Sequence, residues 1–207
     1  MRSIHTALGR LAAAAFIVAA TTFVSAQVGK SQGVVDINTM KEADVATLPG
    51  ITPAIAKALA AKRPFMSITE LNAFLLSQGL TQERANAVYA KAFVHINLNT
   101  ATNEEILLVP GAGRRMAREF PEYRPWRTYA QFDKEIGKYV GAEATAKLAQ
   151  YTFIPLNANT ASDADLMTVP GATHAWVDAV KKGRPYKGAA DLEKVAGKAQ
   201  SRFFVVE

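Results

Sequence analysis

Three short stretches of this 207-residue chain decide its fold: L-P-G-I-T-P at residues 48–53, V-P-G-A-G-R at 109–114 and V-P-G-A-T-H at 169–174. Their glycines, at positions 50, 111 and 171, recur at almost equal intervals. An Asn-Thr pair begins twelve residues before each glycine, and an Arg-Pro-aromatic triplet begins thirteen residues after it. Three landmarks held in one register indicate a tandem array of one small unit. We therefore predict copy 1 over residues 35–94, copy 2 over 95–154 and a truncated copy 3 over 155–207.

The residues around each glycine predict two short helices joined by a tight hairpin. Before the turn, apolar residues recur at i and i+3, as at Val45 and Leu48, and after it they recur at i and i+4, as at Met116 and Phe120. Proline and glycine end the first helix in every copy. We expect an all-α fold of tandem helix, hairpin and helix units, linked by short extended connectors that carry the Asn-Thr pairs.

The later part of each copy differs in length. Copies 1 and 2 contain a second helical pair, which we predict around Leu80-Thr81 and Val140-Gly141. In copy 3 the sequence given ends at Glu207, soon after Leu192, so a full second hairpin does not fit well there. Its apolar tail, residues 203–206, is expected to pack back as a terminal strand or cap, which repeat arrays generally need.

The aromatic residue of each Arg-Pro-aromatic triplet is predicted to be core. Phe65, Trp126 and Tyr186 occupy the same position in the three copies, which favours a plug between hairpins over a surface that stacks on nucleic-acid bases. Trp176 lies on the inner face of its predicted helix and is expected in the core as well.

The complete pattern resembles a known family. An N-x-N-T stretch, an amphipathic turn, [LV]-P-G-[IA]-[TG], a second helix and R-P-[FWY] together look like the helix-hairpin-helix repeats of competence protein ComEA and its exported relatives. The resemblance covers roughly residues 35–192. It implies a non-enzymatic protein that binds DNA through backbone phosphates, with a role in DNA uptake.

A glycine turn that leads into a helix can hold a phosphate for a physical reason. Glycine lets a ligand approach the backbone, and the first N–H groups of the helix point outward beside the positive end of its dipole. Such a contact reads phosphate and not bases. The resemblance places it at Gly50, Ile51 and Thr52 in copy 1, at Gly111, Ala112 and Gly113 in copy 2, and at Gly171, Ala172 and Thr173 in copy 3.

Copy 2 is predicted to be the strongest of the three sites. It alone has a second glycine in the turn, and Arg114, Arg115 and Arg118 follow on the opening turns of the helix. Arg124 and Arg127 continue the basic run beyond that helix. The combination places cations next to exposed backbone N–H groups, as phosphate binding requires.

The other copies rank lower. Copy 3 ranks second, with His174, Lys181, Lys182 and Arg184, and copy 1 ranks last, with Lys57, Lys62 and Arg63. Two plainer interpretations stay open. In the first, the three glycines are only helix C-caps. In the second, the basic run is only a solvated helix face.

Residues 1–26 are expected to be a cleaved secretory signal peptide. Arg2 and Arg10 provide the positive start, Leu11–Val24 forms an apolar run of fourteen residues, and small residues precede a cleavage point at Gln27. The run is shorter than the roughly 20 residues needed to span a bilayer. We expect the mature chain in the periplasm or outside the cell, with residues 27–34 as a linker.

Composition limits the classes of function further. The chain has no cysteine, which excludes disulfides, cysteine nucleophiles and thiolate metal sites. Its formal charge of +6 falls to +4 without Arg2 and Arg10, so a polyanion-binding surface depends on where the cations lie. No H-E-x-x-H spacing, Walker loop or G-x-S-x-G motif is present. We expect no catalytic residue, no cofactor, no metal and no enzyme activity.

Three hypotheses follow from the sequence. The first is an exported, non-enzymatic protein that binds DNA without sequence specificity. The second is a structural or protein-docking scaffold built from the same repeats. In the third, copy 2 binds DNA while the other copies dock an exported or membrane protein, and none of the three involves a small-molecule substrate.

Overall fold

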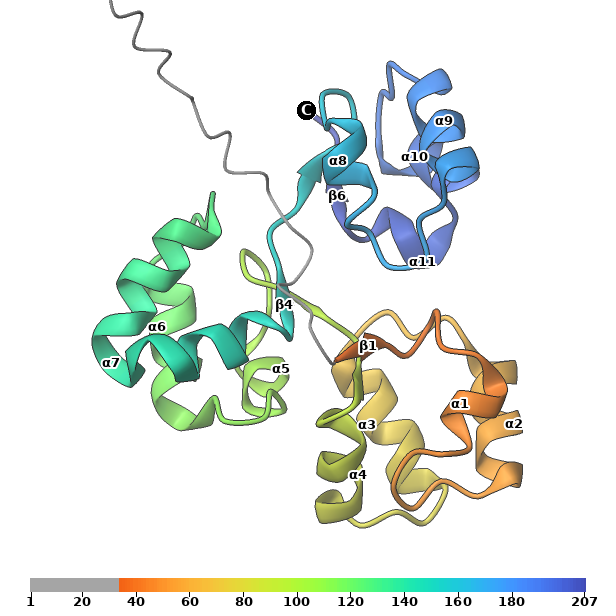
Figure 1. The fold of residues 1–207 in the computed structure, drawn as a ribbon, viewed down its shortest axis with the longest axis vertical. Helices are drawn as coiled ribbons and strands as arrows, with labels where there is room; N and C mark the ends of the chain where they lie inside the picture. Colours follow the sequence, from red (N-terminus) through yellow and green to blue (C-terminus); the bar gives the residue numbers. More distant parts are fainter. Residues whose placement is uncertain (1–33) are drawn as a thin grey trace, which may run out of the picture.

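The structure is a computed structural model that describes residues 34–207. The predicted signal peptide, and all of the predicted linker except residue 34, lie outside the described residues. The described chain is mostly helical, with eleven helices and six two-residue strands. Figure 1 shows the three copies as three lobes, copy 1 orange to yellow-green, copy 2 green to teal and copy 3 blue, around β1 (Val35–Asp36) and β4 (Thr152–Phe153).

Copy 1 begins and ends with a strand, and its four helices lie between them. The Gly50 turn joins the first two helices and the Gly79 turn joins the last two, and both glycines have positive φ. The elements after β1 are α1 (Glu42–Val45), α2 (Pro53–Lys62), α3 (Ile68–Ser77), α4 (Gln82–Tyr89) and β2 (Ala92–Phe93).

Copy 2 repeats this order. Its last helical segment, α7, is interrupted at Gly141, whose φ of 77° and ψ of 166° are not helical, so two helices meet where the second hairpin was predicted. The elements before β4 are β3 (Ile96–Asn97), α5 (Asn103–Leu107), α6 (Gly113–Glu122) and α7 (Tyr129–Ala149).

Copy 3 has a shortened second hairpin. A turn at Gly197, with a φ of 83°, separates α10 from a final helix of only four residues. The second hairpin is therefore present, and the expectation that a full one does not fit is right only in that its last helix is short. The elements are β5 (Leu156–Asn157), α8 (Asp163–Leu166), α9 (His174–Lys182), α10 (Ala189–Ala196), α11 (Lys198–Ser201) and β6 (Phe204–Val205).

A two-stranded parallel sheet closes each copy. The extended connector at the start of a copy pairs with a strand at its end, so the all-α expectation is wrong in this detail. The tail of copy 3 forms such a strand, which confirms the predicted terminal strand. The registers pair Val35 with Ala92, Ile96 with Thr152, and Leu156 with Phe204.

The Asn of each Asn-Thr pair holds the Arg-Pro-aromatic triplet of its own copy. Asn99 accepts a hydrogen bond at Oδ1 from the backbone N–H of Trp126 at 2.6 Å, and its Nδ2 donates to the carbonyl oxygen of the same residue at 3.0 Å. The two landmarks therefore keep a fixed spacing because they form one hydrogen-bonded unit. The same two bonds join Asn38 to Phe65 and Asn159 to Tyr186.

The triplet aromatics are buried, as predicted. The exposed fraction is 0% for Phe65, 1% for Trp126 and 5% for Tyr186. Trp126 also donates its indole N–H to the carbonyl oxygen of Phe120 at 2.8 Å, which satisfies the polar group of a buried ring. Trp176, expected in the core, is only partly buried, at the edge of the core of copy 3.

The buried apolar residues form two clusters. The larger one joins copies 1 and 2, from Val34 to Ile154. The smaller one belongs to copy 3 together with Phe153 of β4. Copies 1 and 2 therefore share one apolar core, whereas copy 3 has a core of its own.

Candidate nucleic-acid interface

The glycine turn of copy 2 needs glycine at two positions. Gly111 has a φ of 86° and Gly113 a φ of 61°, values in the left-handed region that other L-residues rarely adopt. The turn stops α5 and starts α6 at Gly113. The backbone of both glycines lies on the surface. This is the geometry in which a helix start faces outward.

The middle residue of each turn is committed to the turn itself. The N–H of Ala112 donates to the carbonyl oxygen of Val109 at 3.0 Å. The N–H of Ile51 and of Ala172 make the equivalent bonds to Leu48 and Val169. The expectation that Ile51, Ala112 and Ala172 offer free N–H groups to a phosphate is therefore wrong, since these groups close the turn.

The helix that follows the turn is capped in copies 1 and 3 but not in copy 2. Thr52 Oγ1 accepts from the N–H of Ile55 at 3.3 Å, and Thr173 Oγ1 accepts from the N–H of Trp176 at 3.2 Å. In α6 no side chain caps the first turn. Since the first N–H groups of a helix have no partner within it, α6 presents donors that α2 and α9 have partly satisfied.

The three turns differ in how much free space surrounds their glycines. A Cβ placed on Gly111 or Gly113 would meet no atom within 4 Å. A Cβ on Gly171 would lie 3.0 Å from Cγ2 of Thr39, a residue of copy 1, and one on Gly50 would lie 3.5 Å from Cδ of Arg84. Of the three glycine turns, that of copy 2 has the most open space around its glycines, and that of copy 3 has the least.

Acidic side chains are absent from the first turns of the helices that follow the glycine turns, α2, α6 and α9. The first turns of α1, α5 and α8, which precede the turns, each contain two. Acids stabilise the start of an ordinary helix, so their absence leaves the positive end of the dipole uncompensated where the turn faces outward.

The three arginines of α6 are not equivalent. All are exposed, but the Arg115 guanidinium lies 4.5 Å from the ring centroid of Tyr139, and its Nε lies 3.9 Å from a carboxylate oxygen of Glu119. Within residues 34–207, Arg114 and Arg118 form no ion pair. Arg114 and Arg118 are therefore the cations of α6 that a phosphate can engage without displacing an ion-pair partner.

The lysines predicted for copy 3 also differ. Lys181 Nζ lies 2.7 Å from Oδ1 of Asp163 in α8, so its charge is already paired. Lys182 is exposed, and within the described residues it forms no ion pair. The cationic contribution of copy 3 is thus smaller than its sequence predicts.

The arginine of the Arg-Pro-aromatic triplet points inward. Arg124 donates from Nε to the carbonyl oxygen of Leu98 at 2.8 Å and from Nη2 to that of Ala101 at 2.6 Å. Burial lowers the pKa of Arg124, against a smaller opposing effect of Glu105. Arg184 makes the equivalent two bonds in copy 3. The expectation that Arg124 extends the basic run is wrong, because this guanidinium satisfies backbone carbonyls.

One cation at a turn was missed from the sequence. Arg84, in the first turn of α4, lies against Gly50 although the two belong to different hairpins of copy 1. The sequence does not indicate this contact, because Arg84 lies in the second hairpin of copy 1 and far along the chain from Gly50. Arg84 adds a positive charge at the turn of copy 1 and also covers the glycine.

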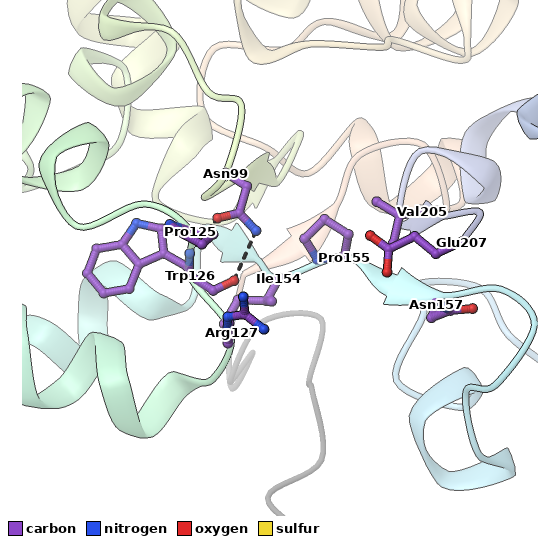
Figure 2. A pocket seen from close by; sticks show the side chains of 9 residues that line it. All are labelled: Asn99, Pro125, Trp126, Arg127, Ile154, Pro155, Asn157, Val205 and Glu207. Atoms are coloured by element: carbon purple, nitrogen blue, oxygen red, sulfur yellow. Dashed lines mark hydrogen bonds between the residues drawn. The ribbon is translucent and has the colours of Figure 1, made fainter.

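A cavity of about 420 Å³ lies between copies 2 and 3, and Figure 2 shows the side chains that line it. Asn99 and Trp126, joined by the dashed hydrogen bond, and Arg127 line it from copy 2. Glu207 lines it from copy 3. Because Arg127 and Glu207 bring opposite charges to the same cavity, it is not a uniformly positive surface for a phosphate.

The described residues contain neither a cluster of metal-binding side chains nor a membrane-spanning helix. In residues 34–207, no group of three or more His, Cys, Asp or Glu side chains is placed to hold a metal ion. None of the helices in that range has the length and apolarity required to cross a membrane.

Comparison with known proteins shows one distant similarity. The chain is 29% identical over 134 residues to a Xenopus laevis protein named endonuclease/exonuclease/phosphatase family domain-containing protein 1. The match covers 48% of this chain and 24% of the relative, so the chain spans about a quarter of the relative's length. No protein-family model matches the chain. No solved structure matches it.

This similarity corrects two expectations. The relative is named for a family of endonucleases, exonucleases and phosphatases, which are enzymes. The expectation of a non-enzymatic DNA-binding protein or scaffold, and that of no enzyme activity, are overturned by it. The chain is therefore similar, at low identity and over part of its length, to a protein whose name denotes phosphate-ester hydrolysis.

Proposed function

We propose that this chain binds the phosphate backbone of DNA through tandem helix-hairpin-helix turns, and that the bound DNA is a substrate for phosphodiester hydrolysis. The observation that carries the binding is the open turn of copy 2. Gly111 and Gly113 leave free space, α6 starts without a side-chain cap, and Arg114 and Arg118 stand beside it without ion-pair partners among the described residues.

The contacts determine what is recognised. Backbone N–H groups and arginines bind phosphate oxygens but do not reach base edges, so the interaction carries no sequence preference. Affinity depends on released counterions and falls with salt, with a log–log slope of about −0.9 for each phosphate neutralised on duplex DNA. The predicted export belongs to the proposal, and it places the DNA outside the cytoplasm.

The hydrolytic part rests on the relative's name alone. Nucleases and phosphatases act on phosphate esters, and a turn that holds the backbone would position a phosphodiester for such chemistry. The part of the chain that the structure describes supplies the binding, and no catalytic residue is assigned within it.

One experiment with two readouts tests both parts. Fluorescence anisotropy with a labelled random duplex in EDTA measures binding, and gel electrophoresis of the same duplex with Mg²⁺ or Mn²⁺ measures cleavage. The wild type should bind with a negative salt slope, and Arg114→Glu with Arg118→Glu should reduce its magnitude by about two. Arg127→Glu is the control for the single reversals Arg114→Glu and Arg118→Glu, because all three change the charge of copy 2 by the same amount and Arg127 lies outside the turn and α6.

The outcomes separate the two parts. Failure of the wild type to bind at low salt would overturn the phosphate-binding proposal. Binding with no cleavage under either cation would overturn the hydrolytic part and leave the binding intact. Equal losses in Arg127→Glu and in each of the single variants Arg114→Glu and Arg118→Glu would show that general surface charge, and not the turn, holds the DNA.

A further inference from the structure

A buried charged cluster joins the three copies. Asp36 lies in β1 of copy 1, His95 precedes β3 of copy 2, and Arg202 lies between α11 and β6 of copy 3. Asp36 and His95 are each 3% exposed, and the side chain of Arg202 is 9% exposed. Polar groups this deeply buried need partners, and each of these residues finds at least one in another copy, although Nε2 of His95 and Nε of Arg202 have no hydrogen-bond partner.

The contacts within the cluster are specific. Arg202 donates from Nη2 to Oδ2 of Asp36 at 2.5 Å and from Nη1 to the main-chain carbonyl oxygen of His95 at 2.7 Å. His95 Nδ1 lies 3.3 Å from the same carboxylate oxygen. The guanidinium also lies 4.3 Å from the ring centroid of Phe203, so its apolar faces are covered.

None of these residues is required by the repeat itself. The strand registers align Asp36 with Asn97 and Asn157, and all three accept the same bond from the N–H two residues later. The turn thus works with Asn, and the carboxylate is particular to copy 1. By the same registers His95 aligns with Val34 and Pro155, and Arg202 aligns with Ala90 and Gln150.

The apolar core of copy 3 is separate from that of copies 1 and 2 except for Phe153 of copy 2, which packs on Phe203, so the position of copy 3 depends strongly on this cluster. A further contact with copy 1 brings Thr39 against the turn glycine, Gly171. Arg202, which holds copy 3 on copy 1, therefore also keeps the Gly171 turn of copy 3 against copy 1. A buried ion pair has strict geometry, and the loss of one partner leaves an uncompensated charge, so such a joint is either closed or open.

We propose that Asp36, His95 and Arg202 form a latch that fixes copy 3 on copies 1 and 2 and keeps the turn at Gly171 covered. When the latch opens, copy 3 becomes a separately folded lobe and its turn loses the cover of Thr39, whereas the flexible side chain of Gln200 in copy 3 stays beside it. The effect on DNA rests on the proposed function, whereas the latch itself does not.

The natural absence of cysteine permits a direct test on the full chain. Spin labels at Lys57→Cys and Glu193→Cys report the distance between copies 1 and 3, and labels at Lys57→Cys and Ala130→Cys report that between copies 1 and 2. All three positions are exposed or partly exposed. The latch variants Asp36→Asn and Arg202→Gln introduce residues that other copies carry at the same positions, so the local fold is retained.

Both distances should be single and narrow in the wild type. Each latch variant should lose the narrow distance between copies 1 and 3 and keep that between copies 1 and 2, with unchanged helical circular dichroism. Asp163→Asn with Lys181→Gln, which removes an exposed ion pair within copy 3, is the control and should change neither. A distance between copies 1 and 3 that stays narrow in both variants, or is broad in the wild type, would overturn the latch, as would broadening of both distances.

DNA binding gives an independent readout. The two variants change the charge of the chain in opposite directions, so general electrostatics predicts opposite effects on affinity. An opened turn predicts a gain in both. Opposite effects would overturn the covering of the turn, while absence of binding by the wild type would contradict the proposed function and leave the distance measurement decisive for the latch.

Discussion

Copies 2 and 3 carry nearly the same turn, V-P-G-A-G-R and V-P-G-A-T-H, yet they present it differently. In copy 2 both glycines face free space, and the helix start is uncapped. In copy 3 Thr173 caps the helix and Thr39 of copy 1 lies against the glycine. A repeat motif thus defines a local shape, and its neighbours decide whether that shape is accessible.

The largest expected difference between the two turns is in stability. Gly111→Ala puts a Cβ into open space and should cost about 1–2 kcal/mol for the left-handed backbone alone. Gly171→Ala should cost about 1–3 kcal/mol more, because the Cβ meets Thr39 at 3.0 Å and Gln200 at 3.3 Å. Urea unfolding of both variants measures the comparison, and equal losses would show that the turn of copy 3 is not confined.

Acid should weaken the hold on copy 3. Burial alone would raise the pKa of Asp36, but the hydrogen bond with His95 and the charge of Arg202 outweigh it and lower that pKa below 3.8. A depressed folded pKa stabilises the protein above the unfolded value, and the contribution is lost as pH falls through the folded value. Urea unfolding at about pH 5 and pH 3 should show a larger loss for the wild type than for Asp36→Asn. The same dependence in both proteins would exclude Asp36 as its source.

Gly113→Thr should make the turn of copy 2 resemble that of copy 3. Threonine disfavours a φ of 61°, and in the extended conformation of Thr52 and Thr173 its hydroxyl caps the helix. We expect DNA affinity to fall by about fivefold, the equivalent of roughly 1 kcal/mol, because a capping oxygen competes with phosphate. Anisotropy measures this change, and an affinity equal to that of the wild type would argue that the uncapped helix start is not used.

The smallest effect is expected from Thr39→Ser. Serine keeps the hydroxyl that donates to the carbonyl oxygen of Asp36 at 3.0 Å, and it removes the methyl group that covers Gly171. With the latch intact, DNA affinity should rise by less than about twofold, since only one methyl group is displaced. A decrease in affinity would show that Thr39 does not obstruct the turn.

The sequence predicted what is repeated and not what joins the copies. Three landmarks in register were enough for the helices, the glycine turns and the buried aromatics, because each depends on contacts within one copy. The hydrogen bonds between Asn99 and Trp126 could not be derived from the sequence, although they explain why the spacing of these two residues is the same in every copy. The prediction for Arg124 was wrong because the sequence does not distinguish an exposed arginine from one that donates to backbone carbonyls of its own copy.

Contacts between copies gave a weaker signal. Asp36 and Arg202 are 166 residues apart, and no local pattern connects them. Their departure from the residues at equivalent positions was visible only once the strand registers had aligned the copies. The covering of Gly171 by Thr39 had no sequence signature at all.

The long separation of Asp36 and Arg202 has a consequence for how the chain folds. Contacts within copies 1 and 2 span far shorter loops, and such contacts form first because their closure costs less entropy. During synthesis the carboxylate of Asp36 is made long before Arg202, so it has only His95 as a side-chain partner from another copy while the first two copies assemble. Formation of the ion pair should therefore be a late folding event that follows the apolar core of copies 1 and 2.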